Sequence, residues 1–388
     1  MKNKALLQVL SVVSLAFIAS FGLASQAMAQ RNTNDYSFGR LYTPVVNVFC
    51  SDGNQDARNI NYAISNSVVG SKINIHGTCL INQTIILKGD RTYVGDSRTG
   101  TILREATGAN LAAIMASDSW VSDSSTTGDP VRIAHLTIEG TGSNGGGSDT
   151  SGLVIRSWLT VIEDLQVENV SGDGIQITGT SENGIPLANT QVNGRISNVF
   201  ITNVGGDGIH VIDGGNSVTD WDLLNSWIGG VGLSGIEMDN AAGWKIIGIH
   251  LYGIRDNAIY ANRCFATTIA DNYIEGFGDA GNAATYYGIA CTLQGNVASV
   301  ISGNKIFQLN KESGSGKYIY IGIPQVNYGI GVVNIVGNAI YGAMGSQDIG
   351  LSYQVGSGTA LRVLSANNVQ NVTIPRLIGS GVTLVSAL

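Results

Sequence analysis

Two segments near the middle of the chain, "SGDGIQITG" (171–179) and "GGDGIHVID" (205–213), share an Asp-Gly-Ile core followed by alternating apolar residues. Weaker copies follow as "LSGIEMDN" (233–240), "DNAIYANR" (256–263) and "YYGIACTL" (286–293). Alternation of apolar and polar residues is the two-residue period of a strand with one buried face. The sequence therefore predicts a series of similar short strands.

A second recurring element precedes most of these strands and is marked by Asn, Asp or Gly. Its steps along the chain are 34, 24, 26, 24, 32, 34 and 30 residues. A repeat of this length, built from strands rather than helices, indicates a solenoid, and Asn suits its turns because it tolerates left-handed backbone. We expect a parallel β-helix, since the hairpins of a β-sandwich would not keep this register. The markers are Asp164, Asn198, Asp222, Gly248, Asn272, Asn304, Asn338 and Asn368.

The N-terminal end of the 388-residue chain has the features of an export signal. Lys2 and Lys4 precede an apolar run over 6–23, and "AMA" follows at 27–29. This pattern predicts a cleaved signal peptide at 1–29 and a secreted or periplasmic protein with no membrane segment after cleavage. The net charge of −7 becomes more negative without the two lysines, so no nucleic-acid partner is expected.

Four cysteines lie beyond this segment, and an exported chain can form disulfides from them. We expect a Cys50–Cys79 disulfide near the N-terminal end. The aligned repeats place Cys291 opposite Ala261, three residues from the level of Cys264, or roughly 10 Å along a strand. That is too far for a disulfide unless a bulge shifts Cys264, so Cys291 is expected to be a buried free thiol.

The segment 45–103, "VVNVFCSDGNQDARNINYAISNSVVGSKINIHGTCLINQTIILKGDRTYVGDSRTGTIL", resembles the opening of the pectin-lyase-like β-helix superfamily. The resemblance rests on a D-G segment, a short helix at 57–64, a strand "INIHGTCLI" and then "TYVGD". It implies a right-handed parallel β-helix, with a cap and first coils at 30–110 and the body with a C-terminal cap at 111–388. Members are hydrolases, lyases, epimerases, fructan transferases and tailspikes that nearly all act on polysaccharides. Some similar folds are trimers, so a homotrimer is one expected assembly.

The aligned coils also predict which polar side chains share the outer surface. Equivalent residues of a parallel stack lie about 4.8 Å apart, and the outward positions are most ionisable between 173 and 263. The catalytic candidates are Glu237, Asp239, Asp207, His210 and Tyr260. The substrate-binding candidates are Asp173, Gln176, Asn262, Arg263, Lys245 and Tyr287.

These residues fit two kinds of polysaccharide cleavage. Glycoside hydrolysis needs a carboxylic acid and a second carboxylate, which Glu237 with Asp239 or Asp207 would supply without a cofactor. A lyase would instead need His210 or Tyr260 as base. It would also need Arg263, Lys245 or a calcium ion, held by Asp207, Glu237 and Asp239, to neutralise the uronate. We favour hydrolysis because the columns carry few cations. A fructan transferase and a non-catalytic glycan-binding helix are further alternatives.

Other groups are expected to play supporting roles. The segments 179–194, 276–287 and 309–328 are expected to be loops that build groove walls, and the rings of Tyr286, Tyr318 and Tyr320 could stack on sugars. Arg156 is expected to be a rim charge. On a second face the repeats align Phe200 with Leu224 and His250, which suggests packing against a loop or a neighbouring subunit.

Overall fold

The computed structural model describes residues 43–142, 149–280, 283–308, 316–343 and 347–386. The signal peptide expected at 1–29 lies outside these ranges. Residues 44–388 form one compact unit. Within the described ranges, none of the helices has the length and apolarity that a membrane crossing requires.

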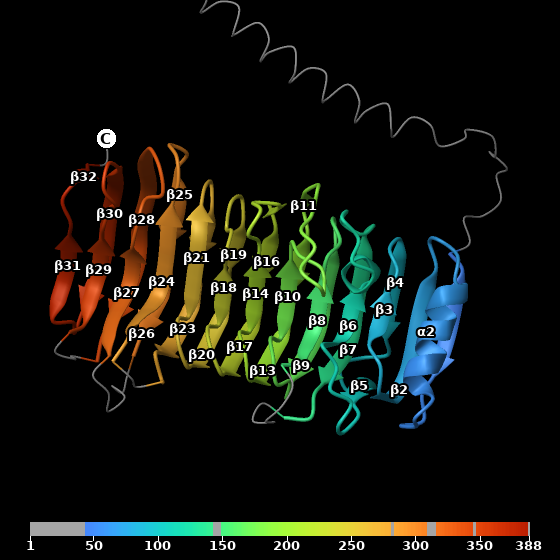
Figure 1. Ribbon diagram of the computed structural model, residues 1–388. Helices are drawn as coiled ribbons and strands as arrows, with labels where there is room; N and C mark the ends of the chain where they lie inside the picture. Colours follow the sequence, from blue (N-terminus) through green and yellow to red (C-terminus); the bar gives the residue numbers. More distant parts are fainter. Residues whose placement is uncertain (1–42, 143–148, 281–282, 309–315, 344–346, 387–388) are drawn as a thin grey trace, which may run out of the picture. The chain divides into compact units, whose positions relative to one another are not determined.

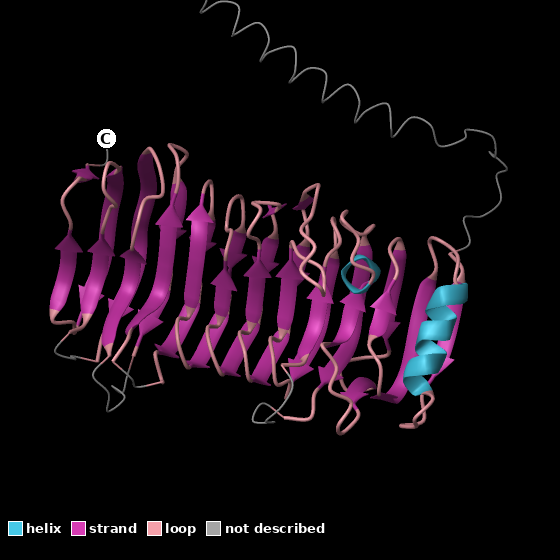
Figure 2. Ribbon diagram, in the orientation of Figure 1, coloured by secondary structure: helices cyan, strands magenta, loops and turns pink. Residues whose placement is uncertain are grey.

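The described chain is a stack of coils whose named strands all pair in parallel, so the expected right-handed parallel β-helix is confirmed (Figures 1 and 2). One sheet of eleven strands runs the length of the stack and carries the Gly-Ile segments of the sequence repeat. Its strands are β3 (Ile85–Leu87), β6 (Ala113–Ser117), β8 (Ser151–Ile155), β10 (Ile175–Thr178), β14 (Ile209–Ile212), β18 (Ile236–Met238), β21 (Ile259–Cys264), β24 (Thr285–Leu293), β27 (Lys317–Ile323), β29 (Ile349–Tyr353) and β31 (Ile374–Ile378).

A second sheet of nineteen strands forms the rest of each coil, to which most coils contribute two strands. A two-stranded sheet pairs β11 (Gln191–Val192) with β15 (Val218–Thr219). The nineteen strands are β1 (Val45–Phe49), β2 (Lys72–Ile81), β4 (Arg91–Gly95), β5 (Thr101–Glu105), β7 (Val131–Glu139), β9 (Val161–Glu168), β12 (Arg195–Ser197), β13 (Phe200–Val204), β16 (Asp222–Leu224), β17 (Trp227–Val231), β19 (Lys245–Ile247), β20 (His250–Ile254), β22 (Thr268–Ala270), β23 (Tyr273–Phe277), β25 (Ser299–Ser302), β26 (Lys305–Phe307), β28 (Ile330–Tyr341), β30 (Ala360–Gln370) and β32 (Val382–Val385).

The corner between the two strands of a coil uses left-handed backbone, as the marker residues led us to expect. Asp164 and Asn198 have φ of 49° and 53°. The marker of the next coil was misplaced, because the corner there is Asn225, with φ 45°, and not Asp222. Asp222 instead lies within β16 and pairs with Arg195.

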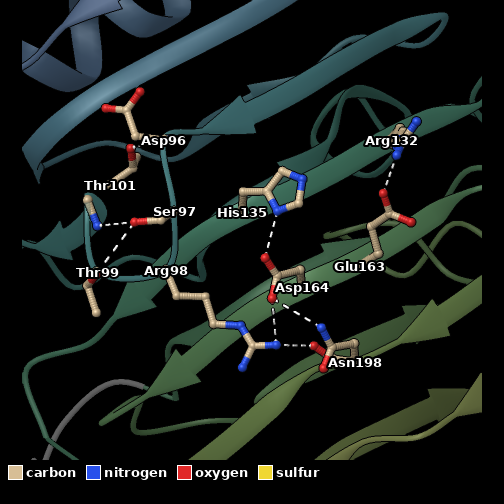
Figure 3. A network of polar contacts seen from close by, with 11 residues as sticks. Asp96, Ser97, Arg98, Thr99, Thr101, Arg132, His135, Glu163, Asp164 and Asn198 are labelled. Carbon is tan, nitrogen blue, oxygen red and sulfur yellow. Dashed lines mark hydrogen bonds and ion pairs between the residues drawn. The ribbon is translucent and has the colours of Figure 1, made fainter.

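A network of polar contacts joins the corners at Asp164 and Asn198 to Arg98, which lies in an earlier loop (Figure 3). Asp164 lies 2.6 Å from Nδ1 of His135 and 2.7 Å from Nη2 of Arg98, and it accepts a hydrogen bond from Asn198. Arg98 also donates to the backbone carbonyl of Asn198 at 2.5 Å. Each of these four residues has a partner within the network. We therefore assign the network a structural role.

The interior of the stack is filled by the inward residues of successive coils. In β10 and β14 the fully buried residues are Ile175, Ile177, Ile209 and Val211, which stack directly on one another. Burial of these aliphatic side chains supplies the main stabilisation, at about 25 cal/mol per Å² of apolar surface. The intervening side chains therefore point outward.

A helix covers one end of the stack, and the last strand of the eleven-stranded sheet stays exposed at the other end. The helix α2 (Asp56–Asn66), which contains the segment predicted as a helix, buries Ile60 and Ile64 against the first coils. A short helix α3 (Asp118–Val121) was not expected. At the other end the residues of β31 remain exposed, although strands at an open edge invite pairing with another chain.

Both pairs of cysteines form disulfides. The predicted Cys50–Cys79 bond is present, with a Cα–Cα distance of 4.9 Å. The expectation that Cys264 and Cys291 remain unpaired is wrong, because they are also bonded and their Cα atoms lie 6.0 Å apart. A register shift between Ala261 and Cys264 brings Cys264 opposite Leu293 and closer to Cys291 than regular strand geometry allows.

Candidate active site

The eleven-stranded sheet brings the central candidate residues side by side on its outer surface. Gln176 of β10 pairs with His210 of β14, His210 with Glu237 of β18, and Glu237 with Tyr260 of β21. All four side chains are partly exposed, while their neighbours in the strands are buried. The expected row is thus present in the structure.

The turns that precede these strands add two aspartates beside the histidine. Nδ1 of His210 lies 2.9 Å from Oδ2 of Asp173 and 3.4 Å from Oδ2 of Asp207. The second oxygen of Asp173 accepts the backbone N–H of Asp207 at 2.9 Å. The two carboxylates therefore hold one ring nitrogen of His210, and the ring is oriented by them.

Ser234 connects this cluster to the glutamate of the next coil. Its backbone N–H donates to Oδ1 of Asp207 at 2.7 Å, and its hydroxyl donates to Oε2 of Glu237 at 2.9 Å. Asn257 is also close to this serine, because its Nδ2 lies 3.5 Å from the serine Oγ. Its Oδ1 accepts the backbone N–H of Tyr287. Asp207 and Glu237 are thereby joined through a single residue.

The electrostatics of this patch push the two linked carboxyls toward their protonated forms. Burial, reinforced by the charge of Asp173, raises the pKa of Asp207 to about 6. Burial also raises the pKa of Glu237 to about 7, although the hydrogen bond from Ser234 lowers it in part. Strongly perturbed carboxyls gathered on one surface are typical of functional sites.

The pKa values of His210 and Tyr260 are also raised. Burial would lower the pKa of His210, but the hydrogen bond and negative charge of Asp173 and the charge of Asp207 outweigh it. Burial raises the pKa of Tyr260, and the nearby charge of Glu237 adds to the effect. The imidazolium form of His210 is therefore stabilised between two carboxylates.

A cleft of about 470 Å³ opens beside the cluster. Asp173, Gln176, Asp207 and His210 line it together with Trp120. We name these residues, with Glu237, Ser234 and Tyr260, the candidate active site. Sequence reasoning missed Ser234 and Trp120. Ser234 stood in an aligned column just before Gly, but nothing in the sequence connected the distant Trp120 with these coils.

The wall of the cleft is held by Arg156, which the sequence analysis took for a rim charge. Its side chain is completely buried and donates to the backbone carbonyls of Ser119, Ser124 and Ile185. These carbonyls belong to the α3 region and to the expected loop at 179–194. The expectation for Arg156 is therefore wrong, because the residue fastens two surface segments from inside.

Asp239, which was predicted to be catalytic, and two predicted substrate-binding residues lie at the margin of the site. Asp239 is exposed and accepts the backbone N–H of Asp213. Asn262 is half-buried and accepts the backbone N–H of Arg263. The guanidinium of Arg263 donates to the backbone carbonyl of Asp213 at 3.1 Å, so it is engaged in holding the turn after β14.

Lys245 is placed away from the other candidates. It belongs to β19 of the nineteen-stranded sheet, and its Nζ lies 3.1 Å from Oδ1 of Asp222. The prediction that it binds substrate beside Glu237 fails because the repeat alignment did not resolve which strand of a coil carried it.

The aromatic candidates divide into one accessible and three buried residues. Tyr287 is half-buried and meets the ring of Tyr260 edge-on, with centroids 6.1 Å apart. Tyr286, Tyr318 and Tyr320 are buried, so their expected stacking on sugars is excluded. The last two belong to β27, which forms a regular coil strand within the segment expected to be a loop.

The calcium site considered for a lyase does not match this arrangement. The groups that approach one another closely are Asp173, Asp207 and His210, not the expected set of Asp207, Glu237 and Asp239. Calcium takes six to eight oxygen ligands. Here one oxygen of each aspartate accepts a backbone N–H, and the third group is an imidazole. This donor set does not fit calcium.

The stacked coils and the polar cleft define a protein with the pectin-lyase-like parallel β-helix fold. The sequence matches no protein-family model and no curated protein. Among solved structures, the chain is similar to the A-module of the Azotobacter vinelandii mannuronan C-5 epimerase AlgE4, with a TM-score of 0.55 and 14% identity over 87% of this chain and 96% of that one.

Two further solved structures show the same likeness. The alginate lyase from Paenibacillus sp. str. FPU-7 has a TM-score of 0.51 and 16% identity over 87% of this chain and 99% of its own. A mutant of the tailspike protein of E. coli bacteriophage HK620 has a TM-score of 0.53 and 10% identity over 87% of this chain and 64% of its own. At such identities the likeness shows the shared fold alone.

Proposed function

We propose that the protein is a carbohydrate-active enzyme that cleaves a polysaccharide by glycoside hydrolysis. The observation that carries this proposal is the pair of carboxyls, Asp207 and Glu237, joined through Ser234 and both raised in pKa. Hydrolysis requires one protonated and one ionised carboxyl beside the scissile bond. Between pH about 6 and about 7, Glu237 is the group that keeps its proton.

The residues then take distinct roles. Glu237 donates its proton to the leaving glycosidic oxygen, and the ionised Asp207 accepts a proton from the attacking water. His210 acts as a positioning residue, because its imidazolium lies between Asp173 and Asp207 and favours the ionised form of Asp207. Trp120 and Gln176 line the cleft that would receive the sugar.

The charge of the site favours a substrate without a carboxylate at the cleavage point. Asp173, Asp207 and Glu237 gather there, while the guanidinium of Arg263 is bound to a backbone carbonyl and Lys245 lies on the other sheet. A uronate at this position would meet the negative charges of Asp173 and Asp207, which the single imidazolium of His210 offsets only in part.

The test is a panel of polysaccharides incubated with the protein and scored for new reducing ends and for unsaturated product. Reducing ends without unsaturated product, lost in Glu237→Gln, are expected. Glu182→Gln is the matched control, because it makes the same change at an exposed side chain. Full activity of Glu237→Gln would exclude the proposed acid.

A second candidate is proton abstraction at C5 of a uronate, as in a lyase or an epimerase. Tyr260 favours it as the proton donor of such a reaction, because its phenol neighbours Glu237 and its raised pKa keeps the phenol protonated. A lyase would give an unsaturated product. An epimerase would release no reducing ends but would invert C5, which NMR of the polymer detects.

We also propose that the protein works outside the cytoplasm. The Cys50–Cys79 and Cys264–Cys291 disulfides support this location, because such bonds persist in oxidising compartments. Together with the expected signal peptide at 1–29, they favour secretion or a periplasmic location.

A further inference from the structure

A second row of ring-bearing side chains lies on the nineteen-stranded sheet, apart from the candidate active site. Phe200, Trp227, His250 and Tyr273 occupy equivalent positions of β13, β17, β20 and β23, which lie side by side in Figure 1. The sequence alignment had placed Leu224 in this row. The structure places Trp227 there instead, because the corner of that coil is at Asn225.

The rings touch one another along the axis of the stack. Phe200 and Trp227 are stacked with centroids 4.4 Å apart, and His250 meets Trp227 edge-on at 6.1 Å. Tyr273 meets His250 at 4.7 Å and Phe307 at 5.2 Å. We call these five residues the aromatic row. It crosses five successive coils, but in the fifth the position paired with Tyr273 is Lys305, and the ring of Phe307 lies in the adjoining column.

The aromatic row ends at a shallow cavity of about 260 Å³. Phe307 and Tyr341 supply rings to its lining, and Lys305, Asn368 and Gln370 supply an ammonium and two amides. Tyr341 is 47% exposed. Gln370 donates to Asn368 at 3.0 Å, while Lys305 is exposed and forms no ion pair with any described residue. Rings, amides and a cation thus surround one small hollow.

We propose that the aromatic row and this end cavity form a second glycan-binding site, which holds an extended polysaccharide chain with one sugar ring in the cavity. Sugars carry apolar C–H surfaces for aromatic rings, and hydroxyl oxygens for amide and ammonium donors. Small-molecule sites combine an apolar lining with a few polar groups in this way.

The direction of the row also suits a polymer. Coils are about 4.8 Å apart, so Phe200, Trp227, His250 and Tyr273 form a track parallel to the axis of the stack, and Phe307 continues it two residues to one side. The row His210, Glu237 and Tyr260 is built on the same coils and follows the same axis. A chain bound on the second face would therefore keep further segments of the same polymer near the cleft.

The composition of the surface argues against a second copy of the chain as the occupant. Interface centres are depleted in Lys and Glu. Here Lys305 stands directly beside Tyr273, and Glu275 stands between Tyr252 and Phe307 in the adjoining column. The ligand class follows from the proposed function, but the binding test below does not depend on turnover.

The test is affinity electrophoresis of the full chain carrying Glu237→Gln, in gels that contain sodium alginate, polygalacturonate or dextran. Tyr341→Ala and Lys305→Ala are then added together. For at least one of the polymers, this double change should weaken the affinity measured from the retardation by about fivefold or more. Tyr62→Ala is the matched control, because Tyr62 is 71% exposed on α2 and far along the stack from the cavity. It should leave retardation unchanged.

Three results would overturn the proposal. The first is retardation that the double change leaves intact, which would assign all binding to the cleft. The second is no retardation of the Glu237→Gln chain by any of the three polymers. The third is an oligomer in sedimentation velocity that the double change dissociates, because the face would then be a subunit interface. Absence of hydrolysis by the unmodified chain on every polysaccharide tested would reject the proposed function. If the Glu237→Gln chain is still retarded, and the double change weakens that retardation, this site stands without it.

Discussion

His210 and Asp173 are 37 residues apart in the chain, yet Nδ1 of the imidazole lies 2.9 Å from Oδ2 of the carboxylate. Two coils of the same sheet bring them together, with Asp173 in the turn before one strand and His210 within the next. The contact raises the pKa of His210 against the opposing effect of burial. Asp173 thereby favours the protonated form of a residue that lines the cleft.

Asp173→Asn should therefore lower the pKa of His210. The variant removes the hydrogen bond and the negative charge of Asp173, so only the charges of Asp207 and Asp239 still oppose the lowering effect of burial. NMR titration of the four histidine rings, with His210 assigned by its loss in His210→Gln, measures the change. Asp164→Asn is the control, because it makes the same change at an equivalent contact to His135. It should leave the pKa of His210 unchanged. A pKa of His210 that stays unchanged in Asp173→Asn would contradict this coupling.

The activity should follow a bell-shaped pH profile. Its acidic limb reports Asp207, with a pKa of about 6, and its basic limb reports Glu237, with a pKa of about 7. Because the two groups interact, the limbs give values for the pair rather than for single residues. The optimum is expected between them.

Ser234→Ala separates the two limbs. The hydroxyl of Ser234 lowers the pKa of Glu237, so its removal should move the basic limb to higher pH. The acidic limb should stay in place, since Asp207 is bound by the backbone N–H of Ser234, which alanine retains. A shift of the basic limb to lower pH would show that another group acts as the acid.

The stability of the fold should also record the raised pKa of Glu237. Its pKa rises from 4.5 to about 7 on folding, so the folded state holds the proton more tightly. Stability is then fully present below pH 4.5 and falls as the pH rises toward and through 7. Relative to the unmodified chain, Glu237→Gln should gain about 3 kcal/mol between pH 4 and pH 8. Thermal unfolding at both pH values measures the difference, and a gain independent of pH would disprove the linkage.

The repeat in the sequence was sufficient to predict the coils and the row His210, Glu237 and Tyr260, because strands of a parallel stack keep side chains in register. It could not predict contacts made by side chains from turns or from distant parts of the chain, such as Asp173 with His210 or Trp120 of α3 with the cleft. Lys245 was misassigned for the related reason that period-two alternation does not tell which strand of a coil a residue occupies.

The corners show the same limit at a finer scale. Asn272, Asn304 and Asn338 were taken as the turn residues, but the left-handed positions are Asp271, Gly303 and Gly337, one residue earlier. The three asparagines are instead buried and form a ladder. Sequence spacing alone does not separate a residue that makes a turn from its neighbour that points inward.

Asn304→Ala should destabilise the protein strongly. The Nδ2 group of Asn304 donates to Oδ1 of Asn338 and to the carbonyl of Ile269, and its Oδ1 accepts the backbone N–H and the amide of Asn272. Alanine leaves several of these buried partners unsatisfied, at a cost of about 3 kcal/mol or more. Urea unfolding measures the loss. Asn368→Ala is the control, because Asn368 is exposed and should change stability by less than about 0.5 kcal/mol.

Removal of the Cys264–Cys291 disulfide is the last prediction. The bond closes a loop between cysteines 27 positions apart, so the double variant Cys264→Ala and Cys291→Ala should lose about 3 kcal/mol of stability. Urea unfolding under non-reducing conditions measures this loss, and the cross-linked peptide should be found by mass spectrometry before reduction. The contrary result is that both thiols can be alkylated in the unfolded, unreduced chain. The two cysteines would then be free, and the register shift at β21 would not bring their sulfurs together.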